Sequence, residues 1–153
     1  MVKYYLAHPI LLRHKVREQE LEFEKRTGIE LVNPFYDGPE KDIIGPLDRG
    51  EITMGQYTER LNRKAKGDEF VLMDLENIQQ TDGVVAVIQR GVTTIGTSME
   101  IWHAFAVAKK PVYIVTDFPG HIWLRFVVER SDGATVKDFK ELARLFKKKA
   151  KPR

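Results

Sequence analysis

The fold is decided by the stretch Gly83-Val84-Val85-Ala86-Val87-Ile88, by the loop that follows it from Gln89 to Thr97, and by the segment Ser98 to Ala108. The run of consecutive apolar residues 84–88 is the pattern of a strand that is covered on both faces. Residues 98–108 are apolar at nearly every position, which predicts a buried helix. A buried strand that leads through a loop into a helix is the repeating unit of a parallel sheet.

The same alternation extends outward toward both ends of the chain. Further strands are predicted at Tyr4–Ala7, Ile29–Val32 and Pro111–Val115, and further helices at Arg13–Thr27, Glu51–Lys64, Asp68–Gln80 and Val136–Lys149. Residues 36–50 are predicted to be a loop, because they carry several glycines and prolines. We therefore expect an α/β fold, specifically a flavodoxin-like, doubly wound parallel sheet of about five strands with helices on both faces.

Length and composition limit the class of protein. The 153 residues are expected to form a single domain, residues 1–153, and the 42% apolar content suits a globular protein with a hydrophobic core. The chain has no cysteine, which excludes disulfide frameworks and thiolate metal sites. The N-terminal apolar run ends at His8 and Pro9, so it is too short for a signal peptide or a membrane span. We expect a cytoplasmic protein without a membrane partner.

Positive charge is concentrated in the predicted basic helix and tail at about residues 136–153. Residues 144–153 contain six basic side chains and no acidic one, so the rest of the chain is mildly acidic although the formal net charge is +3. A tail of this kind can contact nucleic acid, or it can be a solvated helix end whose cations suit the helix dipole. We do not expect a nucleic-acid partner, because no basic stripe with interleaved aromatic residues occurs elsewhere.

The expected strand order nominates two loops as the binding crevice. In open parallel sheets, ligands bind beyond the carboxyl ends of the strands, at the point where the chain reverses direction. In the flavodoxin-like order this point lies between the first and third strands. The loops that follow these strands are Tyr5–Arg13 and Gln89–Glu100. We therefore look for functional residues there.

The second of these loops combines glycines, hydroxyl side chains and one carboxylate. Ser98 is a suitable N-cap, and it would place Glu100 in the first turn of a helix, where the dipole favours the ionised form. Glu100 is then either a nucleophile at the crevice or a side chain whose negative charge only stabilises the positive end of the helix dipole. Thr94 and Gly96 belong to a glycine-containing loop that can cradle a phosphate, although the dinucleotide pattern and the Walker lysine are absent.

The first loop offers Tyr5, His8 and Arg13, each with a structural alternative. The Tyr5 hydroxyl can hold the Glu100 carboxylate, or Tyr5 can be an aromatic core residue. His8 can bind a ligand or fill the turn. Arg13 can pair with a phosphate or be a surface cation. Outside these loops, Asp74 has apolar neighbours and is expected to face inward, where it needs a partner such as a ligand.

Several segments resemble the nucleoside 2-deoxyribosyltransferase family, including the related nucleotide 5'-monophosphate N-glycosidases. Residues 74–86, from Asp74-Leu75 through Ile78 and Asp82 to Ala86, resemble the pattern D-L-x-x-I-x-x-x-D-x-x-x-A. Gly96-Thr97-Ser98-Met99-Glu100, followed by Ala104 and Lys110-Pro111-Val112, resembles G-T-x-x-E-x-x-x-A and K-P-V. Tyr5-Leu6-Ala7 resembles the opening strand of the family. The resemblance extends from residue 3 to about residue 115.

The resemblance implies an enzyme that cleaves the N-glycosidic bond of a 2'-deoxynucleoside through a covalent glutamyl-deoxyribosyl intermediate and transfers the sugar to another base. At matching positions it implies that Glu100 is the nucleophile, that Tyr5 orients it, and that Asp74 binds and protonates the leaving base. This agrees with glycosyl transfer, in which one carboxylate stabilises an oxocarbenium-like transition state and a second acid assists departure. The substrate contacts that we expect around these groups are His8, Arg13, Thr94, Gly96 and Ser98.

The resemblance also sets expectations about partners. It implies no metal and no organic cofactor, and it implies a nucleoside or nucleotide and a free nucleobase as ligands. Members of the family form dimers or larger assemblies, so a homo-oligomer is expected. Trp123 and Phe126 are candidates either for such an interface or for the core.

One position separates the two activities of the family. The transferases typically carry an aspartate two residues before the first glycine of the motif, where this chain has Thr94. A hydroxyl residue there resembles the monophosphate glycosidases, but their Arg-Gly-Gly is replaced by Leu11-Leu12-Arg13. The alternative function is therefore a (deoxy)nucleoside 5'-monophosphate N-glycosidase. An alternative of another class is a noncatalytic nucleotide-binding module.

Overall fold

A five-stranded, all-parallel sheet forms the centre of the protein in the order β2-β1-β3-β4-β5. The computed structural model describes residues 1–38 and 40–150, without the side chains of residues 64–66. The strands are β1 (Lys3–Ala7), β2 (Glu30–Val32), β3 (Val84–Ile88), β4 (Val112–Thr116) and β5 (Ala134–Val136). The predicted flavodoxin-like order is confirmed.

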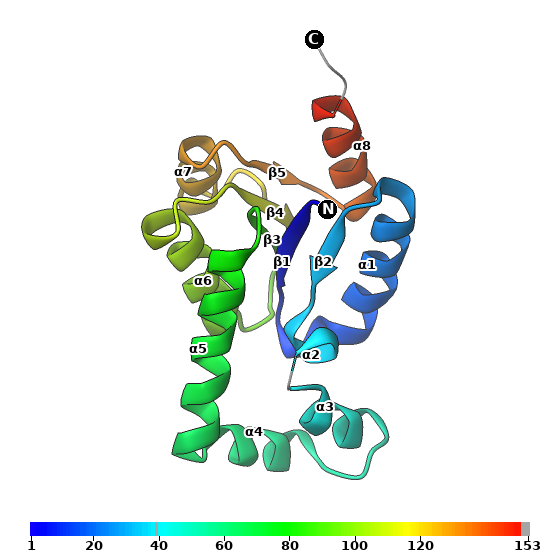
Figure 1. Ribbon diagram of the computed structural model, residues 1–153, viewed down its shortest axis with the longest axis vertical. Coiled ribbons are helices and arrows are strands. Elements are labelled where there is room, and N and C mark those ends of the chain that lie inside the picture. The colour runs from blue at the N-terminus through cyan, green and yellow to red at the C-terminus, as the bar shows by residue number, and fades with distance from the viewer. Residues whose placement is uncertain (39, 151–153) are drawn as a thin grey trace.

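Helices cover both faces of the sheet, as Figure 1 shows. Helices α1 (Arg13–Thr27) and α8 (Phe139–Lys149) pack on one face, with the short η1 (Ile10–Leu12) before α1. The other face is covered by α5 (Lys64–Gln80), α6 (Ile95–Trp102), the π-helical η2 (His103–Val107) and α7 (Ile122–Arg130). Because side chains alternate along a strand, Tyr4 and Leu6 join the first core whereas Tyr5 and Ala7 join the second.

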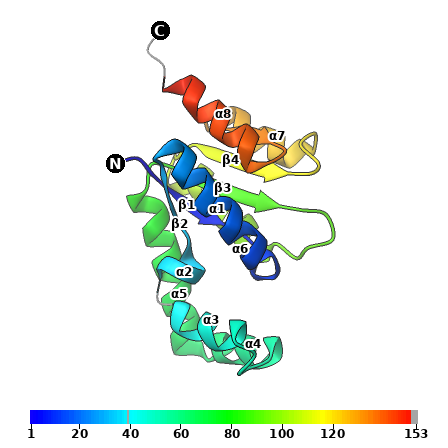
Figure 2. The same ribbon diagram turned by 90° about the vertical axis from the view of Figure 1, so that its right-hand side faces the viewer.

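A helical cover extends beyond the carboxyl end of the sheet (Figures 1 and 2). It consists of α2 (Pro34–Asp37), α3 (Lys41–Asp48) and α4 (Met54–Asn62), which lie beside the first half of α5. The buried side chains at its centre are Ile43, Ile44, Tyr57 and Phe70. The prediction of a loop at residues 36–50 is therefore wrong, because burial of Ile43 and Ile44 outweighs the helix-breaking tendency of Pro46 inside α3.

The helix after β3 begins earlier than predicted. Its N-cap position is Thr94, and Ser98 lies inside the helix, where its backbone N–H donates to the Thr94 carbonyl at 2.8 Å. The prediction of Ser98 as N-cap is wrong, and Glu100 lies in the second turn rather than the first. The expectation of a fully buried helix is also wrong, because Met99 and Trp102 are 64% and 47% exposed.

The C-terminal region differs from the prediction in its first residues. Val136 ends β5 instead of starting a helix, and α8 begins after the N-cap Asp138, whose carboxylate accepts a hydrogen bond from the Glu141 backbone N–H at 2.7 Å. Just before β5, a Cβ atom at position 133 would lie 1.7 Å from the Val112 carbonyl oxygen, so this close approach requires Gly133. The basic residues at 151 and 153 lie outside the described residues.

Candidate active site

The centre of the candidate site is a hydrogen bond between β1 and α6. The Tyr5 hydroxyl donates to Glu100 Oε1 at 2.7 Å. Tyr5 is fully buried between the sheet and its helices, so its ring is held rigidly. Burial and the nearby carboxyl groups of Glu100 and Asp74 raise the pKa of Tyr5 well above its ordinary value, which keeps the hydroxyl protonated as a donor.

A cavity of about 380 Å³ opens beside Glu100, between the carboxyl end of the sheet and the helical cover. Its polar wall brings together residues from the loop after β1, the segment before α3, α4, α5, and α6 with the residues before it. The residues that line it are His8, Pro9, Ile10, Leu11, Phe35, Glu40, Tyr57, Leu61, Asp74, Thr93, Thr94, Ile95, Gly96, Thr97 and Glu100. The size suits a small organic ligand with apolar and polar parts.

Two carboxyl groups in this cavity have raised pKa values. Burial, followed by the charge of Asp74, raises the pKa of Glu100 to about 8, although the hydrogen bond from Tyr5 acts in the opposite direction. Burial raises the pKa of Asp74 to about 6, again opposed by the Tyr5 hydroxyl. Because the two groups interact, they titrate as a pair that holds one proton near neutral pH, and the higher pKa of Glu100 places this proton mainly on Glu100 in the unliganded protein. One carboxylate and one carboxylic acid is the combination that glycosyl transfer uses.

His8 lines the same cavity as a neutral side chain. It is buried, and burial lowers the pKa of His8 to about 4. Its Nε2 lies 3.2 Å from Asn33 Oδ1, and Asn33 Nδ2 donates to Glu20 Oε2 at 2.7 Å. Because Asn33 Oδ1 also accepts from the Phe35 backbone N–H, it is an acceptor for His8 as well. The Nδ1 of His8 lies at the same distance, 3.2 Å, from the Pro9 carbonyl oxygen, so the neutral ring donates its one N–H to either acceptor and brings no positive charge to the cavity.

The other predicted substrate contacts divide into two groups. Thr94 and Gly96 line the cavity, at the start of α6. Ser98 is exposed outside it, with its hydroxyl 3.4 Å from that of Thr94. Arg13 is directed away, because its Nε donates to Asp48 Oδ1 at 2.7 Å and its Nη1 donates to the Ile10 carbonyl at 3.2 Å. Arg13 is not among the described residues that line the cavity.

Sequence reasoning missed Glu40 and Tyr57, which line the cavity from the helical cover. Two signals for this cover are present in the sequence. Asn33 before Pro34 is an N-cap followed by proline at the first helical position, and the Asn33 side chain accepts from the Phe35 N–H. Thr53 and Gln56 have the spacing of a capping box, which the structure forms.

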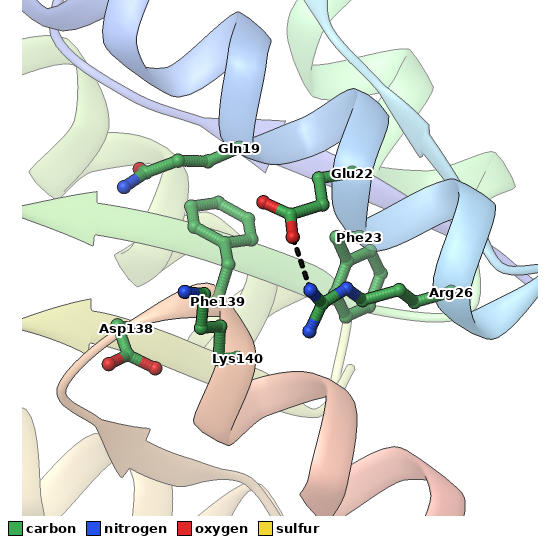
Figure 3. Close-up of a pocket in the computed structure, with 7 residues that line it drawn as sticks. All are labelled: Gln19, Glu22, Phe23, Arg26, Asp138, Phe139 and Lys140. Atoms are coloured by element: carbon green, nitrogen blue, oxygen red, sulfur yellow. Dashed lines mark ion pairs between the residues drawn. The ribbon is translucent and has the colours of Figure 1, made fainter.

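A second cavity, of about 340 Å³, lies between α1 and the start of α8. Figure 3 shows Phe23 and Phe139 at its base and the ion pair of Glu22 with Arg26 at its side. Its acidic side chains are used within the protein, because Glu22 is paired and Asp138 caps α8. Neither carboxylate of this groove is therefore free to act on a ligand, whereas Glu100 and Asp74 line the other cavity.

Within residues 1–38 and 40–150, no three histidine or acidic side chains gather closely enough to hold a metal ion. In the same part of the chain, no helix combines the length and the apolar character that crossing a membrane requires.

Comparison with known proteins supports the assignment of the fold. A 2-deoxyribosyltransferase from the psychrotolerant bacterium Bacillus psychrosaccharolyticus matches with a TM-score of 0.63 and 17% identity, over 93% of this chain and 90% of that chain. The CMP N-glycosidase of Clostridium botulinum matches with a TM-score of 0.54 and 18% identity, over 95% of this chain and 98% of that chain. This chain has their fold. No protein-family model and no curated protein matches it by sequence.

Proposed function

We propose that this protein is an enzyme that cleaves the N-glycosidic bond of a 2'-deoxynucleoside and transfers the sugar to another base. The observation that carries the proposal is the hydrogen bond from Tyr5 to Glu100, in a cavity that also contains Asp74. Two solved structures with the same fold are enzymes named for deoxyribosyl transfer and for CMP N-glycoside cleavage. The fold and the paired carboxyl groups therefore support the same chemistry.

The first step forms a covalent bond between Glu100 and the sugar. The Glu100 carboxylate attacks C1', the C1'–N bond breaks, and its electron pair leaves with the base. The reactive form of the pair is the one in which the shared proton has moved from Glu100 to Asp74, and Asp74 donates this proton to the departing base. Tyr5 holds the attacking carboxylate in line, because its hydroxyl is fixed on one carboxylate oxygen.

The second step releases the sugar from Glu100. An acceptor base, or water, attacks C1' and breaks the ester bond, which regenerates the Glu100 carboxylate. Asp74 takes the proton from the incoming nucleophile, as microscopic reversibility requires. Transfer and hydrolysis therefore use the same three residues and differ only in the acceptor.

A second candidate function is hydrolysis of a 5'-monophosphate, favoured by the hydroxyl residues Thr93 and Thr94 in the cavity wall. Charge argues for the nucleoside instead. The cavity contains three carboxyl groups, and its described lining residues include no lysine or arginine. Since an ionised carboxylate repels phosphate in a cavity of low polarity, we place the uncharged donor first.

A chromatographic assay tests the proposal. The protein is incubated with deoxyadenosine or deoxyinosine, with and without a second base, and in parallel with the corresponding monophosphates. We expect the exchanged deoxynucleoside, for example deoxyadenosine from deoxyinosine plus adenine. Free base from a monophosphate but not from the nucleoside would instead select the second candidate. Tight binding without product from any donor would support a noncatalytic nucleotide-binding module.

The catalytic role of Glu100 is tested in the same assay. Glu100→Ala should lower the rate by at least about 1,000-fold, because it removes the nucleophile. Glu129→Ala is the matched control, since Glu129 is exposed on α7 and pairs only with Arg125. Full activity of Glu100→Ala would rule out the mechanism.

A further inference from the structure

Glu40 is a buried carboxyl group that has little structural use. It occupies the N-cap position of α3, but its side chain makes no capping hydrogen bond. The residue is only 7% exposed. Its Oε2 accepts a hydrogen bond from the Tyr57 hydroxyl at 3.5 Å, a distance at the weak end of the range for hydroxyl donors. A buried carboxyl group with one weak hydrogen bond carries an uncompensated desolvation cost.

Glu40 lines the cavity, and among the described residues none donates a hydrogen bond to its Oε1. Glu40 and Asp74 line both the cavity at Glu100 and a neighbouring cavity of about 440 Å³ between α4 and α5. Glu40 therefore lies where the two cavities meet.

Glu40 belongs to the same group of acids as the proposed catalytic pair. Burial and the charge of Asp74 raise the pKa of Glu40 to about 7, and the charge of Glu40 in turn contributes to the raised pKa of Glu100. Glu100 comes from α6 beside the sheet, whereas Glu40 comes from the helical cover on the other side of the cavity. If the sugar lies at Glu100 and the base beside Asp74, as in the proposed function, the wall that carries Glu40 is left for the edge of the base remote from the sugar.

We propose that Glu40 determines base specificity by accepting a hydrogen bond from an exocyclic amino group of the leaving base, as in adenine or cytosine. A carboxyl group offers an acceptor oxygen whether or not it is protonated, so it pairs with an amino group in either state. A keto oxygen at the same place meets the lone pairs of the ionised carboxylate, and only the protonated acid could donate to it, so the binding comparison is made at pH 8, where Glu40 is mostly ionised. The apolar walls at Ile10, Phe35 and Leu61 suit the faces of a base. This inference rests on the proposed function for the placement of sugar and base.

Equilibrium binding tests the inference independently of turnover. In a Glu100→Gln background, which blocks reaction, calorimetry compares deoxyadenosine with deoxyinosine and deoxycytidine with deoxyuridine. We expect the amino-bearing member of at least one pair to bind roughly 10-fold more tightly, since a buried polar group discriminates strongly against a mismatched partner. Adding Glu40→Gln should reduce or reverse this ratio, because the amide also offers an N–H donor to a keto oxygen.

The control variant is Asp42→Asn, which changes an exposed carboxylate on the same helix and should leave the ratio unchanged. Thermal unfolding of each variant verifies that it is folded, and the ratio of kcat/KM between donors in the Glu40→Gln protein provides a second readout. An unchanged ratio in Glu40→Gln, or no binding of any of the nucleosides, would overturn the inference. Selective binding without turnover of any donor would instead contradict only the proposed catalytic function.

Discussion

At the scale of residues, Tyr5 connects the interior of the sheet to the cavity. Its ring is buried in the core that includes Val84 and Ile114, and its hydroxyl reaches Glu100. The contact between Tyr5 and Glu100 was expected from the resemblance and from the place of Tyr5 near the end of the first strand, and the structure contains it, whereas the catalytic role of the two residues stays a prediction. It could not predict Glu40, since the contact of Glu40 with Tyr57 depends on how α3 and α4 pack.

The Tyr5 hydroxyl is expected to contribute to catalysis by orienting Glu100 and favouring its ionised form. Tyr5→Phe removes the hydrogen bond and should lower kcat/KM on the order of 10- to 100-fold. It should also raise the pKa of Glu100, because the hydroxyl lowers that pKa in the wild-type protein. Steady-state kinetics across pH measure both effects, and an unchanged rate in a folded variant would show that the hydroxyl is dispensable.

The pH dependence of the reaction follows from the paired carboxyl groups. Below pH about 6 the pair holds two protons and lacks the nucleophile, and above pH about 8 it holds none and lacks the acid. A plot of kcat/KM against pH should therefore be bell-shaped, with its maximum near neutral pH. A rate that keeps rising above pH 8 would argue against an acid role for Asp74.

At the scale of elements, the helical cover is what the sequence-based prediction lacked. Glycine and proline between residues 36 and 50 indicated a loop, but Ile43 and Ile44 are buried against Tyr57. Burial of this kind depends on partners distant in sequence, so local residue preferences could not predict it. Likewise, apolar content in α6 predicted burial, whereas only one stripe of the helix meets the sheet. Patterns specified the inner strands better, because β3 is apolar throughout and β4 has a single polar residue, Thr116, at its end, whereas the short β5 was not predicted.

Loosening the helical cover should affect the site without unfolding the sheet. Ile44 is almost fully buried, so Ile44→Ala should destabilise the cover by about 2–4 kcal/mol. Hydrogen exchange is expected to accelerate in α3 and α4 while β1 and β3 stay protected, and KM should rise more than kcat falls. Ile122→Ala, at an exposed position, is the control. Uniform acceleration across the sheet would mean that the cover is not a separate unit.

At the scale of the whole molecule, the sheet brings Tyr5, Asp74 and Glu100 together from three elements distant in sequence. The predicted strand order placed the loops after β1 and β3 at one end of the sheet, and the structure confirms this arrangement. Homo-oligomer formation stays a prediction. Trp123 and Trp102 are exposed on α7 and α6, so packing within the described residues does not account for them.

The free energy of unfolding should depend on pH, because burial of Glu100 disfavours its ionised form. The pKa of Glu100 is about 8 in the folded protein against 4.5 as its ordinary value, so the unfolded chain releases this proton first as pH rises. Glu100 therefore lowers the free energy of unfolding progressively between pH about 4.5 and about 8. Glu100→Gln removes this cost and should be more stable than wild type by up to about 4 kcal/mol at pH 8, but by little at pH 4.5.

Chemical denaturation at the two pH values measures this difference. The comparison must be between variant and wild type, because burial also raises the pKa values of Glu20 and Glu40 to about 7 and adds the same trend to both proteins. Glu51→Gln is the control, since Glu51 is exposed and paired with Arg49. An equal difference at both pH values would show that Glu100 is not buried as an acid.

The most direct test of the account is to detect the sugar on Glu100. The protein is mixed with a 2'-deoxynucleoside that carries fluorine at the sugar C2' atom, which slows release of the intermediate, and the products are measured by intact-mass and peptide mass spectrometry. We expect one added 2-fluoro-2-deoxypentosyl group, located on the peptide that contains Glu100 and absent from Glu100→Gln. Base release without any adduct on Glu100, or an adduct on another carboxylate, would contradict it.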